Sequence, residues 1–119
     1  LSKDSADPYN PKVVRSTMGA IFRLNILQVE DLKQMIETIQ KHQFKLVITS
    51  LEADKNIYNM EYKKKVIVIG NEANGVSKEI QEIADEKVII PMLGKTESLN
   101  ASVAAGIMIY EYVRRKMRK

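Results

Sequence analysis

The chain has 119 residues, one histidine, no cysteine and a formal net charge of +4. This length suits one domain that buries enough surface to fold without disulfides. The lack of cysteine excludes a disulfide framework, a thiolate nucleophile and a cysteine-ligated zinc site. With one histidine as well, we expect no metal site.

The longest largely apolar stretch, residues 101–110, is too short to cross a bilayer. The first ten residues also lack the basic and apolar regions of a signal peptide. We therefore expect no membrane association and a cytoplasmic location, which the lack of cysteine also fits. Because the sequence starts without methionine, we expect it to be part of a longer protein.

The positive charge is concentrated in a basic tail, since five of the last six residues are Lys or Arg. Removing these five charges changes the net charge from +4 to −1. A basic tail suits an anionic partner such as nucleic acid. It suits a solvated helix C-terminus equally well, so both interpretations stay open.

In the first third, Asn10-Pro11 predicts a helix start, with Asn as the cap and Pro at the first helical position. Val14, Met18, Ile21 and Phe22 then fall on one face of that helix. A short extended piece is expected at residues 25–29. A second amphipathic helix is expected at residues 31–42.

The middle third is dominated by two apolar runs. Residues 45–50 form a compact β-branched strand, and residues 66–70 form a strand that is apolar at every position. Such continuous runs are typical of parallel strands covered on both faces. Residues 51–65 are polar and are expected to form a loop. Its lysine run, residues 63–65, is most simply a solvated edge, with RNA contact as the less favoured alternative.

The last third continues the alternation of strands and helices. A short helix is expected after Ser77, a buried strand at residues 87–90 and a long helix from Ser98. This order indicates an α/β fold with a parallel sheet flanked by helices. The last helix has almost no polar side over its first three turns, so we expect it to be buried or covered by another subunit.

Two loops follow the carboxyl ends of the strongest strands, the edge at which open α/β sheets bind ligands. In the first loop, Gly70 would allow a ligand to approach the backbone, Gly75 permits a positive φ, and Glu72 is a carboxylate at the tip. The alternative is an ordinary strand-to-helix turn. Neither a Rossmann fingerprint nor a phosphate-binding P-loop is present.

In the second loop, Pro91 fixes φ at the strand end and Gly94 allows a sharp reversal. Backbone groups of such a loop can bind a purine edge without cationic side chains. From spacing alone, Ser98 is better explained as the cap of the last helix, with Asn100 in its first turn.

The remaining candidates favour structural roles. His42, near a helix C-terminus, is expected to be a surface residue rather than a catalytic base. No Ser-His-Asp set can be assembled. Four tyrosines lack the stacking pattern of RNA-recognition domains and are expected in the core or an interface: Tyr58, Tyr62, Tyr110 and Tyr112.

Three blocks together resemble the SpoU/TrmH family of SPOUT RNA methyltransferases. They are NPKVVRSTMGAIFRLNI at residues 10–26, VIVIGNEANGVS at 66–77 and VIIPMLGKTESLNASVAAGIMIYE at 88–111. The second is similar to the family's Gly-x-Glu-x-x-Gly loop, and the third to its Ile-Pro-Met…Ser-Leu-Asn signature. They span nearly the whole chain in the family's order, and the third is the most specific.

This resemblance implies a parallel α/β sheet with a deep trefoil knot in its C-terminal part, a knot being otherwise almost absent from proteins. It also implies a homodimer in which the last helix helps to form the interface. The whole of residues 1–119 would then be a SpoU/TrmH-type methyltransferase domain without its N-terminal strand and first motif.

The resemblance further implies transfer of a methyl group from S-adenosyl-L-methionine to a ribose 2′-hydroxyl of rRNA or tRNA, mainly by positioning and proton removal. The implied catalytic residues are Glu72, Ser98 and Asn100. The implied cofactor-binding residues are Gly70, Asn71, Glu72, Gly75, Ile90, Pro91, Met92, Gly94, Leu99 and Asn100.

One motif of the family is not found here. Its Asn-x-Gly stretch, which ends in Arg-x-Ala and carries an arginine that assists deprotonation, belongs upstream of residue 10, and Arg15 does not replace it. We therefore expect the fragment alone to bind cofactor without being active. Two alternatives stay open: a non-catalytic RNA-binding or dimerisation module with the same fold, and another kind of α/β nucleotide-binding domain.

Overall fold

The computed structural model describes residues 1–71, 74–93 and 100–118 of the chain. It contains two compact units, Leu1–Met35 and Ile36–Lys119. The division falls within helix α2, Leu32–Gln40. All strands of the sheet and the candidate site belong to the second unit.

In the first unit, the predicted helix start is confirmed, but the helix is shorter than expected. Helix α1, Pro11–Ser16, is capped by Asn10, whose side chain accepts a hydrogen bond from the Lys12 amide. Met18 and Gly19 then adopt positive φ angles of 52° and 86°, which ends the helix. The 3₁₀ helix η1, Ala20–Arg23, follows.

The predicted apolar face of that first helix is therefore wrong. Met18 and Phe22 are 90% and 73% exposed, and only Ile21 is buried. The extended piece that follows is largely irregular. Its last residue, Val29, forms a parallel bridge with Ser2.

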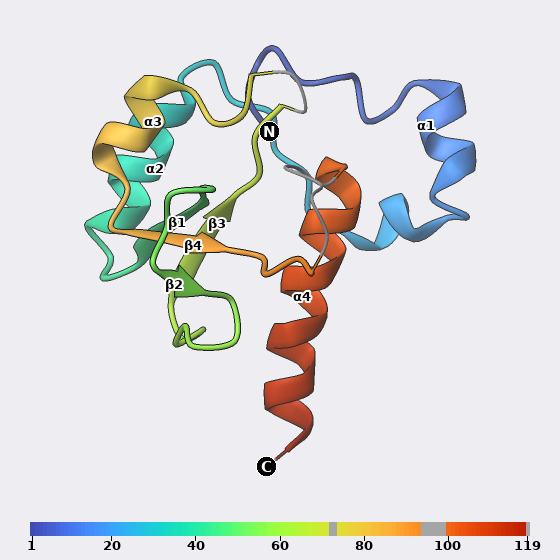
Figure 1. Ribbon diagram of the computed structural model, residues 1–119. Coiled ribbons are helices and arrows are strands. Elements are labelled where there is room, and N and C mark those ends of the chain that lie inside the picture. Colours follow the sequence, from blue (N-terminus) through green and yellow to red (C-terminus); the bar gives the residue numbers. More distant parts are fainter. Residues whose placement is uncertain (72–73, 94–99, 119) are drawn as a thin grey trace. The chain divides into compact units, whose positions relative to one another are not determined.

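The second unit is built on a four-stranded sheet with the order β2-β4-β1-β3, in which all neighbours are parallel. The strands are β1 at Lys45–Thr49, β2 at Lys55–Asn56, β3 at Lys65–Val68 and β4 at Glu86–Ile89. The predicted parallel sheet flanked by helices is confirmed (Figure 1).

Helices cover both faces of this sheet. Helix α3, Lys78–Ile83, lies beside α2, and the Gln40 side chain of α2 donates to the Ile83 carbonyl at 2.9 Å. Helix α4, Ala101–Met117, lies on the other face (Figure 1). Its Met108 joins a buried cluster with Val47 and Val88 of the sheet. Because side chains alternate along a strand, the buried Leu46 and Ile48 face α2 and α3.

Strand β3 is less buried than its sequence predicts. All four residues are half-buried, although we expected cover on both faces. The reason is its position, because β3 is the edge strand beside β1 in the described sheet, whereas β1 has neighbours on both sides.

The expected loop at residues 51–65 is the largest error in the predicted elements. It contains the short strand β2, and Ile57, Met60 and Tyr62 of the same segment are buried in the core. Apolar residues stand alone among polar ones here, so neither helical nor strand periodicity revealed them. The lysine run is not simply solvated either, because the Lys65 Nζ group lies 3.0 Å from Glu86 and its side chain is 6% exposed.

Helix α4 begins later than expected, and it is not buried within the single chain, which leaves cover by another subunit as a prediction. Asn100 is its N-cap, accepting a hydrogen bond from the Ser102 amide at 2.8 Å, so the placement of Asn100 in the first turn is wrong. Of its residues only Met108 and Glu111 are buried, whereas Ile109 and Tyr110 are 57% and 73% exposed.

Among the described residues, no helix is long and apolar enough to span a membrane. The same residues hold no cluster of three or more His, Cys, Asp or Glu side chains that could hold a metal ion. His42 is exposed, as predicted, and its Nδ1 atom lies 3.0 Å from the Thr38 carbonyl oxygen.

Candidate functional site

A cavity of about 300 Å³ lies at the carboxyl ends of the three neighbouring strands β4, β1 and β3. Residues at and after the ends of β1, β3 and β4 line part of the cavity, and the first turns of α4 line the rest. Its described lining comprises Thr49, Ser50, Leu51, Ile69, Gly70, Asn71, Gly75, Val76, Ile89, Ile90, Met92, Ala101 and Ala104. Parallel strands bring both loops that the sequence singled out to this one edge.

The loop after β3 is closed by its own backbone. Asn71 and Gly75 exchange two hydrogen bonds, of 3.2 and 2.7 Å, and Gly75 has a φ of +68°. A Cβ on Gly70 would lie only 2.3 Å from the Gly75 carbonyl carbon and 2.4 Å from the Val76 nitrogen. Close approach of the loop to itself therefore requires glycine at position 70, which also lines the cavity. Its expected role in letting a ligand approach stays a prediction.

The loop after β4 contributes through Ile90 and Met92, which both line the cavity. Pro91 lies between them and is not among the lining residues. Ala101 and Ala104 of α4 also line the cavity. Their small side chains leave space that a larger residue would fill, and α4 therefore contributes a wall of low bulk.

The cavity is apolar and carries no charged side chain among its described lining residues. Thr49, Ser50 and Asn71 are the residues with polar side chains in this lining. This environment fits a mostly apolar ligand that is held by a few polar groups. It also fits a ligand that brings its own positive charge, since no cation lines the described walls to repel it.

The sequence located the two loops but only part of the site. Gly70, Asn71, Gly75, Ile90 and Met92 line the cavity as expected. Asn100 does not line it, and its side chain caps α4. Glu72, Gly94, Ser98 and Leu99 lie outside the described residues, and so does the expected capping by Ser98.

The segment after β1 was missed as part of the site. Thr49, Ser50 and Leu51 line the cavity because β1 is the central neighbour of both loop-bearing strands. The strand itself had been predicted, and the rule that ligands bind at carboxyl ends would have placed its last residues here. What was missing was the strand order, which a single sequence does not contain.

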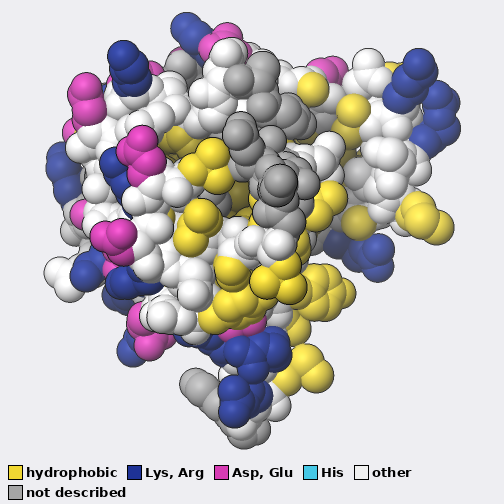
Figure 2. Space-filling model, in the orientation of Figure 1, with side chains coloured by type: hydrophobic (Ala, Val, Ile, Leu, Met, Phe, Trp, Pro, Cys, Tyr) yellow, Lys and Arg dark blue, Asp and Glu magenta, His cyan; other side chains and the backbone are white. Residues whose placement is uncertain are grey.

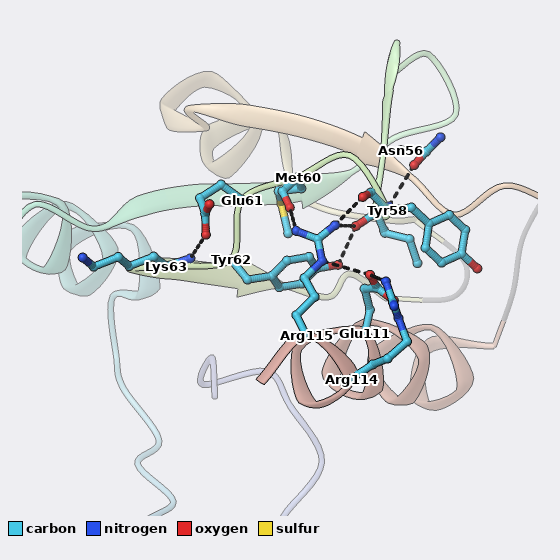
Figure 3. Close-up of polar contacts among 10 residues, drawn as sticks. Asn56, Tyr58, Met60, Glu61, Tyr62, Lys63, Glu111, Arg114 and Arg115 are labelled. Atoms are coloured by element: carbon cyan, nitrogen blue, oxygen red, sulfur yellow. Dashed lines mark hydrogen bonds and ion pairs between the residues drawn. The ribbon is translucent and has the colours of Figure 1, made fainter. Parts of the chain in front are cut away.

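A charged cluster lies elsewhere, where the C-terminal half of α4 contacts the segment 57–62 (Figure 3). The carboxylate of Glu111, which is 5% exposed, accepts hydrogen bonds from Arg114 at 2.8 and 3.0 Å and from Arg115 at 2.9 Å. The hydrogen bonds from Arg114, helped by Arg115 and opposed by burial, lower the pKa of Glu111 from 4.5 to about 2. Arg115 also donates to the Tyr58 and Met60 carbonyls.

Comparison with known proteins decides the family. Residues 1–110 match the family model described as the SpoU rRNA Methylase family. The chain belongs to this family. SpoU relatives include the tRNA (guanosine(18)-2′-O)-methyltransferase of Aquifex aeolicus, with 41% identity over 87% of this chain and 50% of the relative. The 23S rRNA (guanosine-2′-O-)-methyltransferase RlmB of Xylella fastidiosa has 34% identity over 98% of this chain and 47% of the relative.

A solved SpoU structure agrees with the fold described above. The SpoU methyltransferase AviRb from Streptomyces viridochromogenes, in complex with the cofactor AdoMet, matches with a TM-score of 0.89 and 30% identity, over the whole of this chain and 49% of that one. The chain thus spans about half the length of the SpoU relatives it matches.

Proposed function

We propose that this chain is the cofactor-binding part of an enzyme that transfers a methyl group from S-adenosyl-L-methionine to a ribose 2′-hydroxyl of rRNA or tRNA. The observation that carries the proposal is the apolar cavity where the SpoU-like loops after β3 and β4 meet. The names of the Aquifex and Xylella relatives and the AdoMet complex of AviRb support the same reaction.

The described residues fit this cofactor. The cavity volume of about 300 Å³ is at the lower end of the range for small-molecule sites. Ile90, Met92 and Ala104 supply apolar walls, while Ser50 and Asn71 supply polar groups. When bound, S-adenosylmethionine supplies an activated methyl group on a positively charged sulfur, and a lining without cations tolerates that charge.

We assign the reaction's polar roles to Glu72, Ser98 and Asn100, with Gly94, Leu99 and Pro91 as further cofactor neighbours. The Oδ1 atom of Asn100 already accepts from Ser102. The Nδ2 group is therefore the part of Asn100 that would donate to ribose, phosphate or a catalytic arginine. A rigid cap suits this role because a positioned donor costs no ordering during the reaction.

We also propose the family's trefoil knot in the C-terminal part of the chain, where the described residues after β3 and β4 approach the start of α4. Three strand ends and α4 already converge on one cavity, which supports this arrangement. A crystal structure of the chain with its cofactor would test it: a continuous main chain that passes through the loop supports the knot, and an unthreaded path overturns it.

The exposed apolar residues of α4 support the proposal of a homodimer. Val103, Gly106, Tyr110, Val113 and Met117, here called the α4 stripe, alternate at spacings of three and four residues. This spacing forms a seam along one side of a helix, as in paired helices. Val103, Tyr110 and Met117 are 48%, 73% and 78% exposed. Figure 2 shows such hydrophobic side chains along α4, above the Lys and Arg side chains at its carboxyl end.

Because the substrates of the proposed enzyme would be rRNA or tRNA, we place the enzyme in the cytoplasm.

Calorimetric titration with S-adenosylmethionine and S-adenosylhomocysteine tests the proposed function. Ala104→Leu would fill the cavity from α4, and we expect it to abolish saturable binding. Ala105→Leu is the matched control, since this neighbour on the same helix does not line the cavity. Absence of binding by the folded wild-type chain and by the full-length parent would overturn the methyltransferase and favour a non-catalytic module with the same fold.

A further inference from the structure

A second cavity, of about 310 Å³, lies at the opposite end of the sheet. Its walls come from the amino ends of β1 and β3 and from the C-terminal half of α4. We call it the amino-edge groove and define it by Phe44, Tyr62, Lys64, Ile109 and Tyr112. It shares no residue with the cavity at the carboxyl ends of the strands.

Aromatic rings and cations are interleaved around the amino-edge groove. The Lys64 Nζ atom lies 5.9 Å from the centre of the Phe44 ring, and the Lys116 Nζ atom lies 5.1 Å from that of Tyr112. The Arg115 guanidinium lies 4.7 Å from the centre of the Tyr62 ring. Each ring therefore has a cation within reach of its face.

The fold brings together two basic segments that are far apart in the sequence. The lysine run at residues 63–65 enters β3, and the basic tail ends α4. Arg115 joins them by donating to the Met60 carbonyl across 55 residues and by lying over Tyr62 (Figure 3). The sequence alone gave no reason to place these two segments side by side.

The cations of the groove divide into paired and unpaired ones. Lys65 is held by Glu86, and Arg114 and Arg115 are held by Glu111. Within the described part of the chain, Lys64 and Lys116 form no ion pair. No described carboxylate therefore neutralises either charge. Both lysines lie next to an aromatic ring, and Lys116 also interacts with the Tyr112 hydroxyl.

This combination matches the chemistry of single-stranded RNA. Unpaired bases stack on aromatic side chains, and their phosphates bind Lys and Arg. Ile109, Tyr112 and Lys116 lie on a flank of α4 that differs from the α4 stripe, by roughly 100° around a helix with 3.6 residues per turn. A second copy that covers the stripe would thus leave a neighbouring flank for RNA.

We propose that the amino-edge groove binds an unpaired segment of RNA, with Tyr112 or Phe44 stacking a base and Lys64 and Lys116 holding phosphates. The identity of the ligand as RNA rests on the proposed function. The groove lies at the end of the strands opposite the cofactor cavity, so it would hold a part of the RNA away from the methylated ribose. It is a binding surface and not part of the catalytic site.

Fluorescence anisotropy with a short labelled oligouridylate tests this proposal on the chain. The double variant Lys64→Glu/Lys116→Glu should lose at least about tenfold in affinity. The slope of log affinity against log salt should fall by about 1.4, because each phosphate contact to a single strand contributes about 0.7. Tyr112→Leu should lose at least about fivefold, the lower bound for one stacking residue.

The matched control is Lys78→Glu/Lys87→Glu, which makes the same charge change at two exposed lysines of α3 and β4. It should retain nearly the wild-type affinity and the wild-type salt slope. Equal losses in both double variants would overturn the proposal, since they would reflect net charge alone. An RNA affinity in the groove variants that matches wild type would also overturn it.

Photocrosslinking with 4-thiouridine in the same oligonucleotide provides a direct readout. We expect crosslinked peptides that contain Phe44 or Tyr112, and crosslinks only outside the groove would overturn the proposal. Light scattering on the groove variants tests whether a second copy of the chain occupies the groove instead. Variants that become monomeric while their RNA affinity stays unchanged would assign the groove to a second copy. Titration of the groove variants with S-adenosylmethionine should match wild type. If the wild-type chain bound no cofactor but still formed crosslinks in the groove, the proposed methyl transfer would be refuted and RNA binding by the groove would stand.

Discussion

Gly70 illustrates how a single missing side chain shapes the proposed cofactor cavity. A Cβ at this position would lie 2.3 to 2.7 Å from three backbone atoms of Gly75 and Val76. Gly70→Ala should therefore displace the loop, lower the free energy of unfolding by about 1–3 kcal/mol and weaken cofactor binding at least tenfold. Urea unfolding and calorimetric titration measure the two effects.

Gly106 gives the matched control for that substitution. A Cβ there meets no atom within 4 Å, and the residue lies inside α4. Gly106→Ala should raise the free energy of unfolding by about 0.5–1 kcal/mol, because glycine loses more backbone freedom in a helix than alanine. If both variants destabilised the chain equally, close approach would not be the reason for glycine at position 70.

Glu111 should give the chain a characteristic acid sensitivity. Its pKa in the folded chain, about 2, lies below the usual 4.5, so the ionised carboxylate stabilises the fold at neutral pH. That contribution is present above about pH 4.5 and is lost as the pH falls towards 2. Glu111→Gln should lower the free energy of unfolding at pH 7 by about 1–3 kcal/mol and flatten its pH dependence between these values.

Urea unfolding at a series of pH values checks this expectation. Glu79→Gln, at an exposed position of α3, should follow the wild-type curve. Parallel curves for wild type and Glu111→Gln would contradict the assignment. Sequence alone did not single out Glu111, because a Glu three or four residues before two Arg residues is also the pattern of an ordinary solvated helix surface.

At the scale of the element, α4 has two functions on different sides. Its first turns form a wall of the proposed cofactor cavity, and the α4 stripe remains exposed in the single chain. Tyr110→Glu/Val113→Glu would place two charges in the stripe. Because an unpaired buried charge is strongly unfavourable, we expect the proposed dimer to dissociate at least a hundredfold more readily. Light scattering as a function of concentration measures this change.

Tyr58→Glu is a suitable control for the stripe, since Tyr58 is also an exposed tyrosine, at 54%, and lies outside α4. It should leave the oligomeric state unchanged. A wild-type chain and full-length parent that stay monomeric would refute the interface. The sequence predicted a helix without a polar side, but periodicity could not say whether the chain or a second copy covers it.

The elements with strong periodicity were predicted well, and the irregular ones were not. Strands β1, β3 and β4 were expected within one or two residues of where they lie. The segment 57–62 was expected to be a loop, yet its burial depends on contacts with α4. The contact from Arg115 to Met60, for example, joins residues 55 positions apart, and a local sequence pattern contains no information about it.

At the scale of the whole molecule, the parallel sheet determines where the site lies. Alternation of strands and helices predicted the sheet, and the carboxyl-end rule then predicted the edge that holds the cavity. The order β2-β4-β1-β3 was not predictable from spacing, so the contribution of Thr49 to Leu51 was missed. The family resemblance supplied the cofactor, which no pattern of charges or spacing would have named.

Cofactor binding should stabilise the whole second unit, because its cavity joins three strands and α4. S-adenosylmethionine at a hundred times its dissociation constant should raise the free energy of unfolding by about 2.7 kcal/mol. Thermal unfolding followed by circular dichroism measures the shift. The references are the wild-type chain without S-adenosylmethionine and the Ala104→Leu variant with it. A transition that does not move with cofactor concentration would contradict binding to the folded chain.

The hydrogen bond from the Arg115 side chain to the Met60 carbonyl also limits when this part of the core can form during synthesis. The two residues are 55 positions apart. At about 5–20 residues per second, a ribosome adds Arg115 roughly 3–11 seconds after Met60. During that interval Ile57 and Met60, which are fully buried in the finished fold, have no helix to cover them. The core around Ile57 and Met60 can therefore close only after α4 has been made, so this segment is among the last parts of the sheet domain to become buried.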